Sequence, residues 1–321
     1  MRFIFRADAS KATGTGHVMR SIGIIEELIS RNLSVVFVGN TSQVEWINSF
    51  VNSIGFQEIY SNEKDFKPNK ETDILILDSY QIPVDNELIS RINWRFTTAV
   101  VDYSTPNYDV DLKIFPSFIE ESNYLSDSVI LSGPRYIPLR KSINKIHPID
   151  LDSKLNIVVS GGGVDSDNFA VAVSNELATH QSDFNLSIFT NQSDLLAKDS
   201  RFTIYKIGSG LDIVANSCNL AFTTASSTSV EFISRGCAVG LGCSTDNQLS
   251  YYQQFPLMGI ARQVGKLQNG HWFLNKTNIA QLINSRQLRQ ELSEKCTELV
   301  DFSGAKRIVD KILLFVKNSK Y

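Results

Sequence analysis

The fold is decided by the stretch Arg6-Ala-Asp-Ala-Ser-Lys-Ala-Thr-Gly14-Thr-Gly16-His17-Val-Met-Arg20, which follows a short apolar strand at Met1–Phe5. A helix is predicted to begin near His17, because apolar residues recur at helical spacing from there, at Val18, Ile22, Ile25 and Ile29. Backbone N–H groups in a glycine turn before a helix point toward a ligand and favour anions. A histidine at that place titrates near neutral pH and can accept a proton. The stretch therefore predicts an enzyme that acts on a phosphorylated small molecule.

Strands and helices alternate along the first half of the chain. Buried strands are predicted at Phe3–Phe5, Ser34–Gly39, Ile74–Asp78, Thr98–Asp102 and Leu112–Phe115. Helical patterns lie between several of them, at residues 17–30, 42–53 and 84–92, and the polar residues 61–72 are typical of a surface loop. Such alternation favours a parallel sheet covered on both faces.

The same pattern restarts after a polar segment at residues 141–154, which contains Pro148 and is predicted to be an interdomain linker. Strands are predicted at Leu155–Ser160, Leu186–Thr190, Leu220–Thr224 and Ala238–Gly242. Helices are predicted near residues 166–180, 210–217, 227–236 and 276–301, and a terminal amphipathic helix at residues 306–317. We therefore expect two doubly wound α/β domains, residues 1–145 and 152–321, the second including the terminal helix. Ligands bind at the carboxyl ends of such strands, where the motifs fall, so one composite site in a cleft between the domains is expected.

Composition argues against several other classes of protein. The 321 residues carry a net charge of −3 and no long basic run, which does not suggest nucleic-acid binding. The apolar run near Met1 is too short for a signal peptide, and no run reaches the ~20 apolar residues of a membrane span. These features predict a cytoplasmic protein without stable membrane insertion, and we expect a monomer.

The cysteines and most of the histidines are predicted to be structural. Four cysteines, at positions 218, 237, 243 and 296, show no metal-ligand spacing and no paired framework, so buried reduced thiols are expected. Three histidines lack a catalytic setting, namely His147, His180 and His271. No motif requires a metal or another cofactor.

A second candidate site is the hydroxyl-rich stretch from Thr223 to Glu231, which follows a strand and opens a helix. Hydroxyls and free N–H groups at a helix start, here Ser226 to Thr228, suit a diphosphate. Glu231 is placed to accept hydrogen bonds from ribose hydroxyls. An alternative stays open, because Thr228-x-x-Glu231 also matches a capping box in which the glutamate only caps its own helix.

Two further groups have both a binding and a structural interpretation. The amides of Asn247 and Gln248 can bind sugar hydroxyls or an acetamido group, or they can close a plain turn. The triple glycine Gly161-Gly162-Gly163, followed by Asp165, allows close approach of a ligand, but it also suits any tight turn.

Two strand-end aspartates are candidate partners of the histidine. Asp78 and Asp102 each end a predicted strand, and either can orient His17, contact a sugar or cap a turn. In the first loop, Asp8 is a candidate substrate contact, and Arg6 is expected to pair with an acidic neighbour and hold the loop.

These motifs together resemble a known family. The stretch Arg6–Arg20 is similar to the N-terminal signature of the PseG-type UDP-2,4-diacetamido-2,4,6-trideoxy-β-L-altropyranose hydrolases of pseudaminic acid biosynthesis. The resemblance continues in order over most of the chain through Leu77-Asp-Ser-Tyr80, Gly133-Pro-Arg-Tyr-Ile-Pro-Leu-Arg140, Gly161–Gly163, Ala225-Ser-Ser227 with Glu231, and Asn247-Gln248. The later motifs are shared with the wider GT-B glycosyltransferases, including the MurG-like group.

The resemblance implies a GT-B fold, two Rossmann-like domains facing a central cleft, with UDP held by the C-terminal one. It implies that His17 activates water for inverting attack at the anomeric carbon, which releases UDP and a free sugar on the way to a nonulosonic acid. Candidate catalytic residues are thus His17, Asp8 and Asp78. Candidate substrate-binding residues are Gly14, Gly16, Arg20, Tyr80, Gly161, Gly162, Gly163, Ser226, Ser227, Thr228, Glu231, Asn247 and Gln248.

This chain departs from the family pattern where sugar recognition is expected. Tyr103 stands where the family often has a second acidic residue, and Ser79 stands where some members carry a histidine. A usual Asn-rich segment reads Leu112-Lys-Ile-Phe-Pro-Ser117, and the family's Gly-Gly-Ser turn ends here in Gly163. These changes bear on the identity of the hexose more than on the reaction.

Two other functions remain as alternatives. A glycosyltransferase on the same fold would use His17 to deprotonate a sugar hydroxyl instead of water. A sugar-nucleotide binding protein without catalysis would not need the Gly-x-Gly-His loop.

Overall fold

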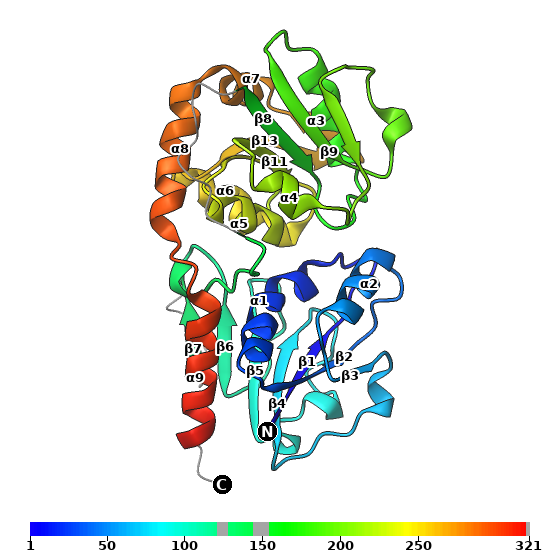
Figure 1. Cartoon of the computed structure of the whole chain (residues 1–321), viewed down its shortest axis with the longest axis vertical. Coiled ribbons are helices and arrows are strands. Elements are labelled where there is room, and N and C mark those ends of the chain that lie inside the picture. Colours follow the sequence, from blue (N-terminus) through cyan, green and yellow to red (C-terminus); the bar gives the residue numbers. More distant parts are fainter. Residues whose placement is uncertain (121–127, 144–153, 319–321) are drawn as a thin grey trace. The chain divides into compact units, whose positions relative to one another are not determined.

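The computed structural model of the chain describes residues 1–120, 128–143 and 154–318 (Figure 1). The chain divides into two compact units. The first unit comprises Met1–Lys141 and Asp301–Tyr321, and the second comprises Ser142–Val300. Most of the expected linker, with His147, lies outside the described residues.

The first unit is built on a parallel sheet in the order β3-β2-β1-β4-β5-β6-β7. Its strands are β1 (Arg2–Ala7), β2 (Ser34–Val38), β3 (Glu58–Tyr60), β4 (Asp73–Asp78), β5 (Phe96–Val100), β6 (Leu112–Phe115) and β7 (Val129–Ser132). Phe3 and Phe5 of β1 face one apolar cluster while Ile4 faces another, so the strand is buried on both faces. This explains why its sequence is a continuous apolar run.

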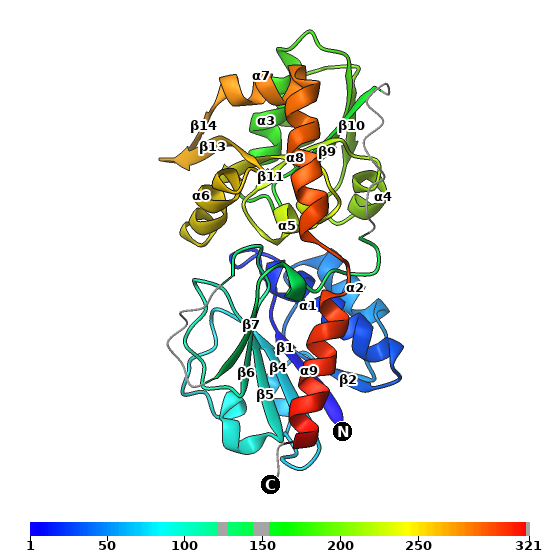
Figure 2. The same ribbon diagram turned by 90° about the vertical axis from the view of Figure 1, so that its left-hand side faces the viewer.

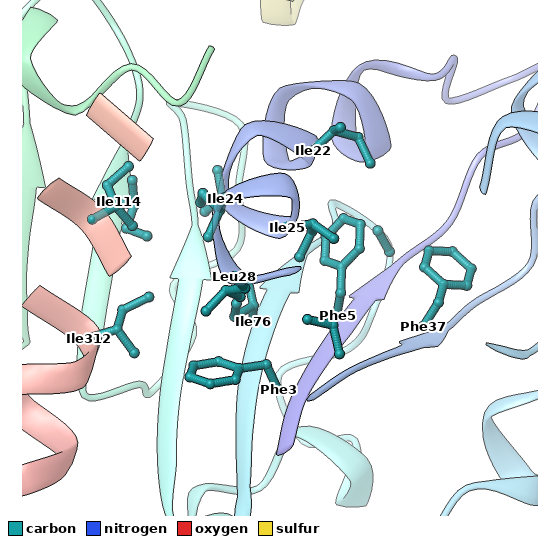
Figure 3. Close-up of a cluster of buried hydrophobic side chains, with 14 of the residues drawn as sticks. Phe3, Phe5, Ile22, Ile24, Ile25, Leu28, Phe37, Ile76, Ile114 and Ile312 are labelled. Atoms are coloured by element: carbon teal, nitrogen blue, oxygen red, sulfur yellow. The ribbon is translucent and has the colours of Figure 1, made fainter. Parts of the chain in front are cut away.

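Helices cover one face of this sheet, and turns and loops cover the other. The described helices of the unit are α1 (Gly16–Ser30), α2 (Glu45–Ser53) and α9 (Gly304–Asn318). Figure 3 shows Ile25 and Leu28 of α1 and Ile312 of α9 packed against Phe3 and Phe5. The opposite face is covered by short 3-10 turns that bury Ile89 and Trp94. The residues 84–92, predicted to be one helix, form two such turns, Glu87–Ile89 and Arg91–Asn93, because Ser90 is extended between them (ψ 121°).

The terminal helix α9 corrects the expected domain boundary. Residues 306–317 are helical as predicted, but Ile308, Val309, Ile312 and Val316 are buried in the core of the first unit and not of the second. Figure 2 shows α9 against the first sheet. An amphipathic pattern fixes which face of a helix is buried but not against which sheet, so the sequence left this open.

The second unit repeats the architecture in the order β10-β9-β8-β11-β12-β13-β14. Its strands are β8 (Leu155–Ser160), β9 (Phe184–Phe189), β10 (Phe202–Tyr205), β11 (Leu220–Thr224), β12 (Ala238–Cys243), β13 (Arg262–Gln268) and β14 (His271–Leu274). All pairs are parallel except β13 with β14. The helices are α3 (Phe169–Ala178), α4 (Leu211–Ala215), α5 (Ser227–Ser234), α6 (Leu249–Leu257), α7 (Lys276–Asn284) and α8 (Arg286–Leu299).

The single helix predicted over residues 276–301 is two helices. Ser285 is extended (φ −97°, ψ 99°), and its hydroxyl accepts a hydrogen bond from the Leu288 N–H, so it ends α7 and caps α8.

Several strands escaped prediction from the sequence. Three of them, β3, β7 and β10, are short and lie at or next to a sheet edge, where partial exposure removes the apolar run. The hairpin β13–β14 did carry a recognisable signal, since Asn269 and Gly270 form its turn with positive φ (51° and 77°).

All four cysteines are buried and free, which confirms their expected placement. Over the described ranges, no helix has both the length and the apolar character to cross a bilayer.

Candidate functional site

Each sheet reverses its strand order beside its first strand, and the candidate residues lie there. In the first sheet β1 stands between β2 and β4, and in the second β8 stands between β9 and β11. At such a switch point the loops after adjacent strands diverge and leave room for a ligand. The loop after β1 leads to His17, and β4 ends in Asp78.

His17 and Asp78 form a buried pair in the first unit. The Nδ1 atom of His17 lies 2.6 Å from Oδ1 of Asp78, whose side chain is fully buried. Because Asp78 is ionised at neutral pH, as shown below, Nδ1 carries the proton and donates it to the carboxylate. Among the described residues, Nε2 has no hydrogen-bond partner and is not one of the fully buried unpaired atoms. The pair therefore presents a basic nitrogen that keeps access to solvent.

Asp78 accepts three more hydrogen bonds from side chains of α1. Arg20 donates from Nε (2.8 Å) and Nη2 (2.6 Å), and the Ser21 hydroxyl donates at 2.7 Å. Burial by itself raises the pKa of the Asp78 carboxyl, but Arg20 and His17 outweigh it and hold that pKa below its ordinary value. The carboxylate is thus ionised and fixed in orientation.

Arg20 joins Asp78 to a second aspartate. Its Nη1 lies 2.5 Å from Oδ2 of Asp102, and the same oxygen accepts a hydrogen bond from the Tyr80 hydroxyl. The Tyr80 ring packs edge-to-face on the imidazole of His17, with centroids 3.9 Å apart. We call these five residues, His17, Arg20, Asp78, Tyr80 and Asp102, the histidine cluster.

The helical spacing of α1 accounts for much of this cluster. Residues three and four apart lie on one face of a helix, so His17, Arg20 and Ser21 point the same way. Sequence reasoning did not single out Ser21, although this spacing was the available signal. It also left open which aspartate meets His17; the structure selects Asp78, and Asp102 reaches the cluster through Arg20 and Tyr80.

The loop before α1 supplies backbone donors next to His17. Gly14 has a positive φ of 74° and exchanges two backbone hydrogen bonds with Ser10, which closes a tight loop. Thr15, which precedes Gly16, gives α1 no side-chain cap. The first N–H groups of the helix thus have no side-chain cap, and the binding of an anion to them stays a prediction.

Asp8 lies outside the cluster. Its carboxylate accepts hydrogen bonds from Arg6 (2.7 Å) and from the Asn40 N–H (2.7 Å), and Arg6 also pairs with Glu63 at 2.9 Å. The expected pairing of Arg6 with acidic neighbours is confirmed. Asp8 therefore ties the β1 loop to the β2 loop, and its contact with substrate stays a prediction.

In the second unit, the glycine turn meets the hydroxyl-rich stretch. The Thr224 hydroxyl donates to the carbonyl of Gly161 at 3.3 Å. A Cβ added at Gly162, whose φ is 98°, would lie 3.8 Å from the Thr224 hydroxyl and 4.0 Å from that of Thr228. The two motifs, about 60 residues apart in sequence, thus lie next to each other at the ends of β8 and β11.

The start of α5 has unused donors, and its geometry excludes the capping-box alternative. Ser226 is the N-cap, and its hydroxyl donates to the Thr224 carbonyl instead of accepting from an N–H group of the helix. The helix therefore begins one residue before Thr228, and Glu231 lies beyond the third helical position, where a capping box needs its glutamate. In the described part of the chain, the N–H groups of Ser227 and Thr228 reach no acceptor. These two donors point to an anion site at the helix start.

Asp165 caps the neighbouring helix α3 beside the glycine turn. Its carboxylate accepts hydrogen bonds from the N–H groups of Phe169 (2.9 Å) and Ala170 (3.2 Å). A Cβ at Gly161 would overlap its Oδ1, so the glycine is needed for this approach. Burial raises the pKa of the Asp165 carboxyl to about 7, against the effect of the two N–H groups.

The paired amides take part in a turn at the end of β12. The Asn247 side chain accepts a hydrogen bond from the Thr245 hydroxyl, and Gln248 accepts one from the Ser244 N–H. This is the structural alternative considered for them; each side chain keeps its NH2 group for a ligand. The departures from the family pattern are also structural in part, since the Ser79 hydroxyl accepts from two backbone N–H groups and the Tyr103 ring packs on Phe115.

Comparisons with known proteins bear on the fold. No family model matches the chain. An uncharacterised protein of Methanocaldococcus jannaschii, MJ1062, is 22% identical over 79% of this chain. The chain spans 58% of the length of that relative.

Solved structures of sugar-processing proteins match nearly the whole chain. MurG of Acinetobacter baumannii has a TM-score of 0.62 at 14% identity and covers 98% of this chain and 100% of its own. A putative UDP-N-acetylglucosamine 2-epimerase of Listeria monocytogenes has a TM-score of 0.64 at 12% identity and covers 100% of this chain and 98% of its own. UGT89C1 of Arabidopsis thaliana, solved with UDP, has a TM-score of 0.65 at 10% identity and covers 98% of this chain and 99% of its own. The chain therefore has the two-unit Rossmann-like fold of the GT-B glycosyltransferases.

Proposed function

We propose that this protein hydrolyses a UDP-activated 2,4-diacetamido-2,4,6-trideoxyhexose to UDP and the free sugar, a step toward a nonulosonic acid. The observation that carries the proposal is the His17–Asp78 pair, with Nδ1 held at 2.6 Å by a buried carboxylate and Nε2 left unpaired among the described residues. A histidine held in this way is a general base of fixed direction. The choice of sugar rests on the resemblance of the N-terminal loop to the PseG-type hydrolases.

In the proposed reaction, His17 Nε2 takes a proton from water as the water oxygen bonds to the anomeric carbon. The bond from that carbon to the UDP oxygen breaks, UDP leaves with the electron pair, and the configuration at the carbon inverts. The imidazolium that forms is stabilised by Asp78. General-base help of this kind contributes about 10²–10⁴-fold to the rate.

The second unit is proposed to bind UDP. The unpaired N–H groups of Ser227 and Thr228 suit the diphosphate, and the turn at Gly161–Gly163 lets its oxygens approach the backbone. Glu231 is proposed to accept the ribose hydroxyls, and Asn247 and Gln248 to offer their NH2 groups to the sugar. That a UDP complex and a UDP-N-acetylglucosamine epimerase share this fold supports a UDP-sugar substrate. We further expect a monomeric cytoplasmic enzyme.

A glycosyltransferase is the second candidate, favoured by the structural similarity to MurG. His17 would then deprotonate an acceptor hydroxyl instead of water, and the other site residues would keep the roles proposed for the hydrolase. The two functions differ in whether UDP is released without an acceptor.

The deciding experiment measures UDP release from a panel of UDP-2,4-diacetamido-2,4,6-trideoxyhexoses in metal chelator and without acceptor. We expect rapid release by the wild type and loss of release in His17→Ala. The matched control is His271→Ala, which changes an exposed histidine of the β13–β14 hairpin and should keep full activity. UDP binding without release would overturn the hydrolase and favour the transferase, and unchanged turnover in His17→Ala would reject the base.

A further inference from the structure

Asp102 is the member of the histidine cluster that is linked to the imidazole through its neighbours, and its carboxylate accepts hydrogen bonds on both oxygens. Its Oδ2 accepts hydrogen bonds from Arg20 and Tyr80. Its Oδ1 accepts from the N–H of Ser104 (2.9 Å) and the hydroxyl of Thr105 (3.2 Å). Donors on both oxygens favour an ionised carboxylate, because a neutral acid or an amide carries a hydrogen on one side.

The charge of Asp102 agrees with these contacts. Burial raises the pKa of its carboxyl, but Arg20 and Tyr80 outweigh this and hold the pKa below its ordinary value. Apart from His17, the cluster then has two carboxylates and one guanidinium, a net charge of −1.

Two of these contacts connect Asp102 to His17. The Tyr80 hydroxyl donates to Asp102, and the Tyr80 ring packs against the imidazole with ring centroids 3.9 Å apart. Arg20 donates to Asp102 from Nη1, and it donates to Asp78 from Nε and Nη2. Asp78 in turn fixes Nδ1 of His17. The side chains that Asp102 anchors thus support the imidazole in two ways. Tyr80 packs against its ring, and Arg20 holds the carboxylate that accepts from Nδ1.

The register of the sheet brings these groups together. In the pairing of β4 with β5, Leu77 lies opposite Ala99. Tyr80 and Asp102 each lie two residues beyond the end of these strands, so the parallel register brings them side by side. The anchoring therefore lies directly after two paired strands of the sheet, which fix where the two segments begin.

We propose that Asp102 is a positioning residue, which holds Tyr80 against the imidazole and Arg20 on Asp78 so that His17 keeps its direction. Asp102 itself does not contact the substrate. The kinetic consequence rests on the proposed hydrolase function, whereas the structural consequence does not.

The kinetic test compares Asp102→Asn with the wild type in UDP release. The amide has nearly the same shape but turns an NH2 group toward donors, so Tyr80 or Arg20 loses its anchor. We expect kcat to fall about 10–100-fold, the effect of a small misplacement of a catalytic group, while KM changes less than 3-fold. The matched control is Asp109→Asn in the same loop, whose carboxylate is 83% exposed and should leave both constants unchanged.

Tyr80→Phe tests the same chain of contacts at its other end. This variant keeps the ring and loses only the hydroxyl that Asp102 holds. If Asp102 acts through Tyr80 and Arg20, Asp102→Asn combined with Tyr80→Phe should lose no more than Asp102→Asn alone. Full additivity of the two losses would contradict a shared role.

A second readout does not depend on activity. The chain has four histidines, so the Cε1–H proton resonance of His17 can be assigned by its loss in His17→Ala. The Tyr80 ring shifts this resonance, and Tyr80→Leu defines how much. In Asp102→Asn the resonance should move at least halfway toward its position in Tyr80→Leu, with Asp109→Asn at the wild-type position.

The outcomes separate this inference from the proposed function. A wild type that releases no UDP, together with the expected resonance shift, rejects the hydrolase and keeps the positioning role. An unmoved resonance in a folded Asp102→Asn variant overturns the positioning role whatever the activity. A rise in KM with unchanged kcat would instead make Asp102 a contact of the sugar.

Discussion

At the scale of single residues, the protein's chemistry depends on which nitrogen of His17 carries the proton. The choice is made by Asp78, a carboxylate that Arg20 and Ser21 keep ionised and in place. A neutral amide at this position would donate to Nδ1 and place the imidazole proton on Nε2, where it blocks the base.

We predict that Asp78→Asn lowers the rate of UDP release by at least about 100-fold, because general-base catalysis of that size is lost. UDP affinity, measured by calorimetry, should not change, since the proposed UDP contacts lie in the second unit. His271→Ala is the control for histidine content. Retention of more than a tenth of the wild-type rate would contradict the proton assignment.

Residue spacing predicted part of this arrangement. The helical face shared by His17, Arg20 and Ser21 follows from the sequence, because three- and four-residue spacing repeats on a helix. The partner aspartate does not follow, since Asp78 and Asp102 both end apolar strands and look equivalent. Only the pairing of β1 with β4 puts Asp78 nearer to the start of α1.

At the scale of elements, the start of α5 distinguishes a binding role of Glu231 from a capping role. Glu231→Ala should weaken UDP binding about 10-fold or more, as expected for the loss of hydrogen bonds to a charged group. The free energy of unfolding should change by less than about 0.5 kcal/mol, because Ser226 and not Thr228 begins the helix. Calorimetry measures the UDP affinity, and denaturant unfolding measures the free energy of unfolding. Lower stability with unchanged affinity would restore the capping interpretation.

The cap of α3 predicts a pH dependence of stability. The pKa of the Asp165 carboxyl rises in the folded protein from 3.8 to about 7, with burial as the largest cause. The native state therefore favours the neutral acid, and this contribution is complete below pH 3.8 and lost as the pH rises through 7. The second unit should become less stable between about pH 4 and 7, by an amount on the order of 4 kcal/mol.

Asp165→Asn tests this, because the amide still accepts from an N–H but does not titrate. The free energy of unfolding of Asp165→Asn should no longer fall with rising pH, whereas Asp194→Asn, at an exposed position, should keep this pH dependence. Fluorescence of Trp272 in a background with Trp46→Phe and Trp94→Phe reports on the second unit. A slope that persists in Asp165→Asn would contradict the assignment.

At the scale of the whole molecule, the chain returns to its first unit through α9. Ile312 is buried in that unit's core, whereas Leu314, two residues away, is 48% exposed. Ile312→Ala should lower the unfolding free energy of the first unit by about 2–5 kcal/mol, the usual cost of truncating a buried aliphatic side chain. Leu314→Ala should change it by less than about 0.5 kcal/mol.

Trp46 and Trp94 report on this unit once Trp272 is replaced by Phe. The second unit, followed by Trp272 in the complementary background, should unfold as before in Ile312→Ala. Destabilisation of the second unit alone would restore the boundary expected from the sequence.

The sequence by itself determined the α/β class, most of the buried strands and the two motif-bearing turns. These features are local, since an apolar run, a glycine turn and helical periodicity each extend over a few residues. Tertiary structure alone decided that α9 packs on the first sheet, that Asp78 and not Asp102 meets His17, and that the glycine turn faces Thr224 and Thr228. Such contacts join residues 61 or more positions apart, and their free energy comes from burial and strand pairing that no short segment encodes.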